Sequence, residues 1–196
     1  MLIATRSKGK FPEIVAKLKG LPFEYVNLNN TNLSKDFEVD EPALTFEGNA
    51  IIKAMTIGKK TGILTLAEDA GLEVDALDGR PGVYSKRYAS GTDEDRCKKL
   101  LGELRNIPDE KRTASFVAVT AIYDPDNDKI RTCRGVYVGR ITSKPTGTNG
   151  FGYDPIFYNT KLHKTNAEMS IEEKNGVSHR GKALQKAAKI LKKEFV

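Results

Sequence analysis

The chain has 196 residues, of which 39% are hydrophobic and 30% are charged, and its formal net charge is +6. This length accommodates one sizeable core, so we expect a single domain over residues 1–196. No segment approaches the roughly eighteen uncharged apolar residues of a membrane span, which excludes a membrane-spanning helix. The positive charge favours an anionic partner: a nucleic acid, a membrane surface or a phosphorylated small molecule.

Two features predict a cytoplasmic protein. The apolar run at Met1 is short and meets Arg6 at once, which is typical of a strand and not of a signal peptide. The two cysteines, Cys97 and Cys133, lie far apart and have no metal-ligand spacing around them. We therefore expect ordinary reduced thiols in a cytosolic protein.

The first third of the chain alternates short apolar runs with helical patterns. Residues 1–5 predict a buried strand, and a helix with Pro12 in its first turn follows. Residues 23–28 predict a second strand, and residues 45–62 predict a long helix. Residues 63–67 form another apolar run, which we expect to be a strand that ends at two acids.

The middle of the chain has a different pattern. Thr92 and Asp95 resemble a capping box that opens a helix. Residues 114–123 and 130–141 predict two long strands joined by a turn, and a final helix begins at about residue 179. Because strands and helices alternate early and two strands follow each other later, we predict an α/β fold. Its sheet is mixed, partly antiparallel and flanked by helices.

The turn between the first strand and the first helix is the first candidate site. It holds Lys8 and Lys10 on either side of Gly9. A helix N-terminus presents unpaired N–H groups and a partial positive charge, so it binds phosphate readily. The spacing is not that of a Walker A loop. The alternative is an exposed basic loop without a ligand.

Two adjacent acids, Glu68 and Asp69, form the second candidate site. Magnesium prefers carboxylate oxygens together with substrate phosphates, and hydrolysis needs a base that orients water. Glu47 and Lys53 on the preceding long helix offer a further acid and a further cation. The alternatives are a solvated turn for the acid pair and a favourable interaction of Glu47 with the helix dipole.

The third and fourth candidates lie near the C-terminus. Residues 151–154 place two aromatics around a glycine, followed by an acid, and base stacking on an aromatic ring is worth about 1–3 kcal/mol. Core aromatics are the alternative. Lys174 precedes His179 and Arg180, whose charges at a helix start are disfavoured by the helix dipole. That placement indicates an anion or a carbonyl-rich base as partner, although a structural histidine is equally compatible.

These motifs, taken together, resemble the inosine/xanthosine triphosphate pyrophosphatase family over nearly the whole chain. The matching segments are residues 4–10, 45–54, 68–74, 77–85, 150–157 and 173–182. Their order and spacing make a chance similarity improbable.

The resemblance implies hydrolysis of ITP, dITP and XTP to the monophosphate and pyrophosphate, with Mg²⁺, by a homodimer. It implies an elongated sheet in two lobes with a cleft between them. Asp69 would be the proton acceptor and a metal ligand. The implied substrate-binding residues are Thr5, Ser7, Lys8, Lys10, Lys53, Ala70, Phe151, Gly152, Tyr153, Asp154, Lys174, His179 and Arg180. A 6-oxo purine offers an acceptor to donors such as His179 and Arg180, whereas the amine of adenine leaves such a donor unpaired.

The chain departs from the family pattern at four positions. These are Ser7 for the usual Asn, Gly48 for a metal-binding Glu, Ala70 for Ser or Thr, and Thr146 for Arg. In place of the missing Glu, we expect Glu47 or Glu68 to join Asp69 at the metal.

Two other functions remain open. One is a pyrophosphatase for another modified nucleotide, such as a pyrimidine. The other is a basic nucleic-acid-binding module, which the net charge of +6 suggests. The basic residues are scattered or gathered on the last helix, and acids lie inside the candidate site. We therefore predict an enzyme with a nucleotide substrate, and neither a nucleic acid nor a membrane as partner.

Overall fold

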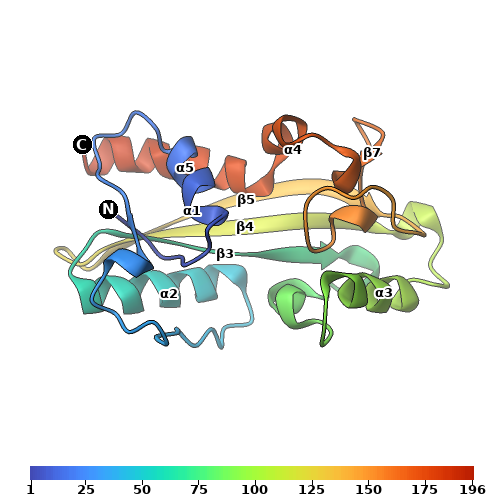
Figure 1. Cartoon of the computed structure of the whole chain (residues 1–196), viewed down its shortest axis with the longest axis horizontal. Helices are drawn as coiled ribbons and strands as arrows, with labels where there is room; N and C mark the ends of the chain where they lie inside the picture. The colour runs from blue at the N-terminus through green and yellow to red at the C-terminus, as the bar shows by residue number, and fades with distance from the viewer. The chain divides into compact units, whose positions relative to one another are not determined.

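The computed structural model describes residues 1–196 and has an α/β fold (Figure 1). The strands are β1 (Leu2–Ile3), β2 (Val26–Asn27), β3 (Thr65–Val74), β4 (Thr113–Asp124), β5 (Lys129–Ile141), β6 (Phe157–Asn159) and β7 (Lys164–Thr165). The α-helices are α1 (Lys10–Lys17), α2 (Phe46–Thr61), α3 (Asp93–Glu103), α4 (Ile171–Val177) and α5 (His179–Glu194).

The seven strands form one mixed sheet in the order β2-β1-β3-β4-β5-β6-β7. Strand β1 runs parallel to both β2 and β3, with Leu2 opposite Val26 and Thr65. Strand β6 is antiparallel to both β5 and β7. The predicted mixed, partly antiparallel sheet flanked by helices is therefore confirmed.

The local capping signals place the helices where the sequence predicts them. The Oγ1 of Thr45 accepts a hydrogen bond from the N–H of Gly48 at 3.0 Å and caps α2, which ends at Gly62 with a left-handed φ of 66°. The predicted capping box of Thr92 and Asp95 opens α3. The first two strands are shorter than predicted, because only two residues of each pair with β-ladder geometry.

Strand β3 is longer than predicted, so the expectation that it ends at Glu68 and Asp69 is wrong. The strand continues through the buried Leu72 and Val74, which pack into a core beyond the acids. Successive side chains of a strand point to opposite faces of the sheet. Because both acids lie inside the strand, they face opposite sides.

The chain divides into two compact units, which we describe in turn. Unit 1 comprises Met1–Asp69, Ala118–Gly135 and Arg180–Val196. Within it, α1 and α5 cover one face of the strands and α2 covers the other (Figure 1). The core on the side of α1 and α5 includes Ile3, Ile14, Leu18, Leu66, Leu184 and Leu191. On the other side, a Cβ at Gly58 of α2 would lie 2.5 Å from the Tyr123 ring, so the helix packs closely on β4.

Unit 2 comprises Ala70–Val117 and Val136–His179. Its core is aromatic: the ring of Phe157 lies 4.5 Å from that of Phe116 and 5.0 Å from that of Tyr137, centroid to centroid. Helix α3 contributes Cys97 and Leu100 to the same core. This core supports the segment that carries Phe151 to Asp154.

No helix is both long enough and apolar enough to cross a membrane. The single domain over residues 1–196 and the cleft between two lobes stay predictions.

Candidate active site

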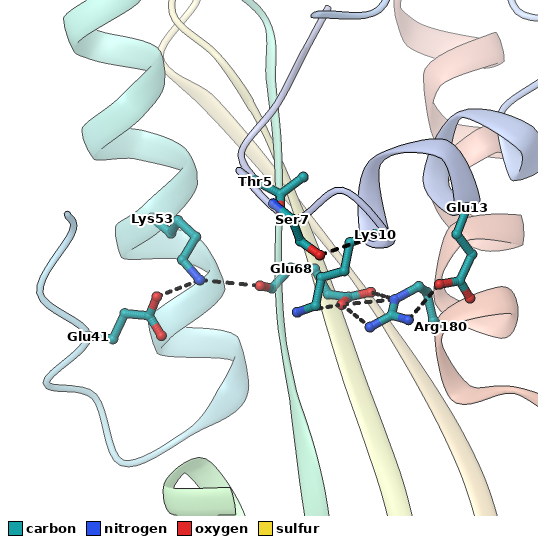
Figure 2. A network of polar contacts seen from close by, with 8 residues as sticks. All are labelled: Thr5, Ser7, Lys10, Glu13, Glu41, Lys53, Glu68 and Arg180. Atoms are coloured by element: carbon teal, nitrogen blue, oxygen red, sulfur yellow. Dashed lines mark hydrogen bonds and ion pairs between the residues drawn. The ribbon is translucent and has the colours of Figure 1, made fainter. Parts of the chain in front are cut away.

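The carboxylate of Glu68 lies in a buried network of charges on the α1 and α5 side of β3 (Figure 2). Arg180 at the start of α5 donates from Nε to Oε2 and from Nη2 to Oε1 of Glu68, both at 2.9 Å. Its Nη1 donates to Oε2 of Glu13 on α1 at 2.8 Å. The ammonium of Lys10 lies 3.7 Å from Oε1 of Glu68. Two carboxylates and two cations therefore compensate each other in this network.

Arg180 stays charged in this network. Burial acts to lower the pKa of its guanidinium, but the ion pairs with Glu68 and Glu13 raise the pKa above its ordinary value. Both oxygens of Glu68 accept hydrogen bonds from Arg180. A metal ion at Glu68 would therefore compete with the guanidinium for the same atoms.

Asp69 has a different environment on the α2 side of β3. Its Oδ2 accepts a hydrogen bond from Nδ2 of Asn49 at 3.2 Å, and the side chain is partly exposed. Asn49 is buried, and its Oδ1 accepts the N–H of Ala43 at 2.9 Å. The amide of Asn49 is thereby oriented with its NH₂ group toward Asp69. This neutral partner orients the carboxylate without cancelling its charge.

Lys53 of α2 contacts both Glu41 and the backbone of Glu68. Its Nζ is 2.5 Å from Oε1 of Glu41 and 3.4 Å from the carbonyl oxygen of Glu68 (Figure 2). The sequence interpretation missed Glu41. Its only sequence signal is a place in an acid-rich loop, which is typical of a solvated segment.

Gly48 explains how the loop that carries Glu41 reaches α2. A Cβ at Gly48 would lie 2.6 Å from the Cβ of Ala43. A residue with a side chain at this position, such as the Glu usual in the resembled family, would push the loop away. The glycine therefore permits the close path of the loop that precedes α2.

The predicted phosphate turn lines a small pocket of about 60 Å³. Thr5, Lys10, Lys53 and Glu68 contribute its polar lining. The Oγ of Ser7 accepts the N–H of Lys10 at 3.2 Å. Lys8, which belongs to the same turn, is exposed. The structure thus gathers cations from α1 and α2 around one polar pocket.

The three predicted metal ligands do not come together. Glu47 is exposed and accepts a hydrogen bond from Oγ1 of Thr132 at 2.5 Å, while Glu68 and Asp69 face opposite sides of β3. No three His, Cys, Asp or Glu side chains are arranged to hold a metal ion. Ala70 follows Asp69 without contributing a hydroxyl. The ligand role of each acid stays a prediction.

In unit 2, Phe151 and Asp154 form a second cluster with Lys174. Phe151 is 67% exposed, and Nζ of Lys174 lies 4.9 Å from the centroid of its ring. Asp154 is buried, contacts the Lys174 ammonium, and accepts the N–H of Phe151 at 2.9 Å. Tyr153 is buried, and its hydroxyl donates to the carbonyl of Ser85 at 2.8 Å. Phe151 is therefore the aromatic ring of this segment that is exposed for stacking.

His179 is half-buried and stacks on Phe116 within unit 2. The ring centroids are 5.1 Å apart and the planes are inclined by 14°. The neighbouring Arg180 is bonded to the carboxylates of unit 1. The predicted contacts of these two residues with a purine edge stay predictions.

The fold and the cluster of lysines around an acid define an α/β protein suited to phosphorylated small molecules. The chain belongs to the Ham1 family, whose model matches residues 1–190. It is 48% identical to the dITP/XTP pyrophosphatase of Geobacter sulfurreducens over 94% of this chain and 92% of that protein. The structure of a HAM1 protein from Coxiella burnetii matches with a TM-score of 0.91 and 39% identity, covering 98% of each chain. That of the Staphylococcus aureus Ham1 protein matches with a TM-score of 0.89 and 37% identity, covering 99% of this chain and 100% of that one.

Proposed function

We propose that the protein hydrolyses the deaminated purine nucleotides dITP, ITP and XTP to the monophosphate and pyrophosphate. The observation that carries the proposal is the polar region of unit 1, where Asp69 is oriented by Asn49 and Lys53 lies in the adjoining pocket. The naming of a relative 48% identical as a dITP/XTP pyrophosphatase supports the choice of substrate.

The triphosphate binds, in this proposal, to the turn that precedes α1. Thr5, Ser7, Lys8 and Lys10 supply hydroxyls, backbone N–H groups and positive charge at the N-terminus of a helix. Such an N-terminus favours a phosphate group. Lys53 adds a cation from α2 on the other side of the pocket.

Asp69 is the proposed general base. Its carboxylate takes the proton from the water that attacks the α-phosphorus. Lys10 and Lys53 then stabilise the negative charge of the departing pyrophosphate. Asn49 holds the carboxylate in place through the NH₂ group of its neutral amide.

We propose Mg²⁺ as the cofactor, held by Asp69 and Glu41. Magnesium is commonly bound by one or two carboxylates together with substrate phosphates, so a cluster of three acids is unnecessary. Glu41 pairs with Lys53 through Oε1, so a metal would share this carboxylate with the lysine, whereas both oxygens of Glu68 bind Arg180 and the exposed Glu47 binds Thr132. The metal, when bound, supplies charge neutralisation to the phosphate oxygens.

Base recognition is assigned to residues of unit 2. The exposed Phe151 ring offers a surface for stacking, and Gly152 and Asp154 fix its segment. Lys174 contributes positive charge beside the ring. We propose that His179 and Arg180 contact the 6-oxo edge of the purine, since the amine of adenine offers no acceptor there. Tyr153 supports the segment from the core.

We further propose a homodimer, on the strength of the family resemblance. Light scattering of the purified chain tests this point, with a single species at twice the mass of 21.6 kDa as the expected result. A monomer at micromolar concentration would contradict it.

Pyrophosphate release from ITP, XTP, GTP, ATP and dTTP, with and without Mg²⁺, tests the function. We expect Mg²⁺-dependent turnover of ITP and XTP well above that of GTP and ATP. Preferential turnover of dTTP would contradict the purine assignment in favour of a modified-pyrimidine enzyme. Absence of turnover, together with steeply salt-dependent binding of DNA or RNA, would favour the basic binding module instead.

A further inference from the structure

Helix α3 holds both backbone polar groups of Gly152. The N–H of Gly152 donates to Oδ2 of Asp93 at 2.6 Å, and the thiol of Cys97 donates to the carbonyl of Gly152 at 3.3 Å. Asp93 and Cys97 are four residues apart, so both side chains lie on one face of the helix. The two contacts bridge 59 and 55 residues of sequence. Helix α3 thereby fixes the backbone next to Phe151.

The conformation of the segment is set from inside by Asp154. Its Oδ2 accepts the N–H of Phe151 at 2.9 Å, and its Oδ1 accepts Nδ2 of Asn166 at 3.1 Å. Gly152 has a left-handed φ of 63°, which favours glycine. The contacts of Asp154 thus define the shape of the turn. The contacts with Asp93 and Cys97 attach that turn to α3.

The carboxylate of Asp93 is oriented toward Gly152 by a second partner. Arg96 binds Oδ1 and leaves Oδ2 directed at the N–H of Gly152. The hydrogen bond from Gly152 lowers the pKa of Asp93, burial opposes this, and Arg96 lowers it further. The carboxylate is therefore ionised, and hence a strong acceptor, at neutral pH.

Helix capping does not account for this arrangement. The capping box of α3 is formed by Thr92 and Asp95, whose side chains bond to each other's backbone N–H groups. Asp93 is thus not needed as the cap. Cys97 is 3% exposed, and burial chiefly raises the pKa of its thiol to about 11, so the sulfur keeps its proton and stays a donor.

We propose that Asp93 and Cys97 are positioning residues that set the affinity for the nucleobase by fixing Gly152 beside the exposed ring of Phe151. The proposal rests on the function proposed above. Neither residue contacts the substrate in this account. Both act through the backbone of the segment that carries the stacking ring, so their loss weakens binding more than turnover.

Three variants test the role of Asp93. Asp93→Ala removes the acceptor, Asp93→Asn keeps an oxygen that accepts the Gly152 N–H, and Glu94→Ala changes an exposed neighbour that pairs with Lys98. For Asp93→Ala we expect the KM for ITP to rise about 10-fold with kcat changed less than about 3-fold, as for the loss of one charge-assisted hydrogen bond. Asp93→Asn should restore most of the affinity, and Glu94→Ala should match the wild type.

A binding measurement separates positioning from general loss of structure. Calorimetric titration with IMP gives the affinity for the base-bearing product without turnover. We expect the Kd of Asp93→Ala to rise about 10-fold while its thermal unfolding stays cooperative. An unchanged KM and Kd in this variant would overturn the proposal, as would an equal loss in Asp93→Asn.

Cys97→Ala tests the weaker contact. We expect a rise in the Kd for IMP of about 3-fold, since a thiol is a weak donor, and an unchanged Kd would remove Cys97 from the proposal. The wild type separates the two proposals: if it turns over none of the triphosphates, the proposed function fails. If it hydrolyses ITP and Asp93→Ala has its normal KM, only the positioning role fails.

Discussion

Glu68 and Asp69 are neighbours in one strand, yet their surroundings differ in kind. Glu68 is 8% exposed and bonded to the guanidinium of Arg180, with Lys10 nearby. Asp69 is partly exposed and accepts a hydrogen bond from the neutral amide of Asn49. The strand alternation places one acid under α1 and α5 and the other under α2. The face of the sheet, and not the residue type, therefore decides which partner each carboxylate meets.

The energetic consequences of the two environments differ. Removing one partner of a buried ion pair leaves an uncompensated charge, which costs about 3–5 kcal/mol of stability. Changing the carboxylate of the partly exposed Asp69 to an amide keeps the size of the side chain and an oxygen that accepts from Asn49. We therefore expect substitutions at Glu68 to lower mainly the stability of the protein and substitutions at Asp69 to lower mainly its activity.

The largest effect is expected for Asp69→Asn. The change removes the proposed base and a proposed metal ligand, so kcat should fall by about 10⁴-fold, equivalent to about 5.4 kcal/mol. Because the amide keeps the shape of the side chain, the midpoint of thermal unfolding should stay near that of the wild type. Steady-state pyrophosphate release and calorimetry measure the two quantities. Near-normal turnover would show that Asp69 is not the base.

The next effect is expected for Glu68→Ala. Of its two carboxylate partners, Glu68 and Glu13, Arg180 would keep only Glu13. We therefore expect a loss of about 3 kcal/mol in the free energy of unfolding. Urea denaturation followed by circular dichroism measures this loss. Leu64 directly precedes β3, is partly buried against the core on the side of α1 and α5, and carries no charge, so Leu64→Ala is a control for loss of side-chain volume alone. A loss below about 1 kcal/mol in Glu68→Ala would contradict a structural role.

The helices of the fold could be predicted because their signals are local. Thr45 and Thr92 cap their helices through atoms three residues away, and Gly62 ends α2 with a left-handed φ. The length of β3 could not be predicted in this way. Its continuation past Asp69 depends on strand pairing and on a second core that includes Leu72, and neither is written in the residues of the strand itself.

Local motifs also made part of the candidate site predictable, although its role stays a prediction. Asp69 and Lys53 stand in recognisable motifs, whereas the partners of Arg180 lie 112 and 167 residues away and make its guanidinium part of a charge network. Glu41 was missed because its loop has no periodic pattern. Its placement beside Lys53 follows from the close approach that Gly48 allows, which only the three-dimensional structure reveals.

A smaller effect distinguishes the acids proposed for the metal. Glu41→Gln should raise the Mg²⁺ concentration for half-maximal activity by about 10-fold, as for a weakened metal site. Glu47→Gln is the matched control, because it removes an equal charge from an exposed acid whose carboxylate binds Thr132. Titration of activity with Mg²⁺ at saturating ITP compares them. The reverse order of effects would return the ligand role to Glu47.

The smallest effect extends the comparison to Asp93, a carboxylate that binds Arg96 through one oxygen and holds a backbone N–H through the other. Its pKa is lowered from 3.8 chiefly by the hydrogen bond from Gly152. Because the folded-state pKa lies below the unfolded value, this contribution to stability is present above about pH 3.8 and is lost as the pH falls through the folded-state pKa.

The difference in unfolding free energy between the wild type and Asp93→Ala should therefore be larger at pH 6 than at pH 3. Urea denaturation at both values measures it, and Glu94→Ala should stay within about 0.5 kcal/mol of the wild type at pH 6. A difference that does not change with pH would mean that protonated Asp93 holds Gly152 equally well. The charge would then be irrelevant to this contact, in contrast to Glu68, where it is the reason for the contact.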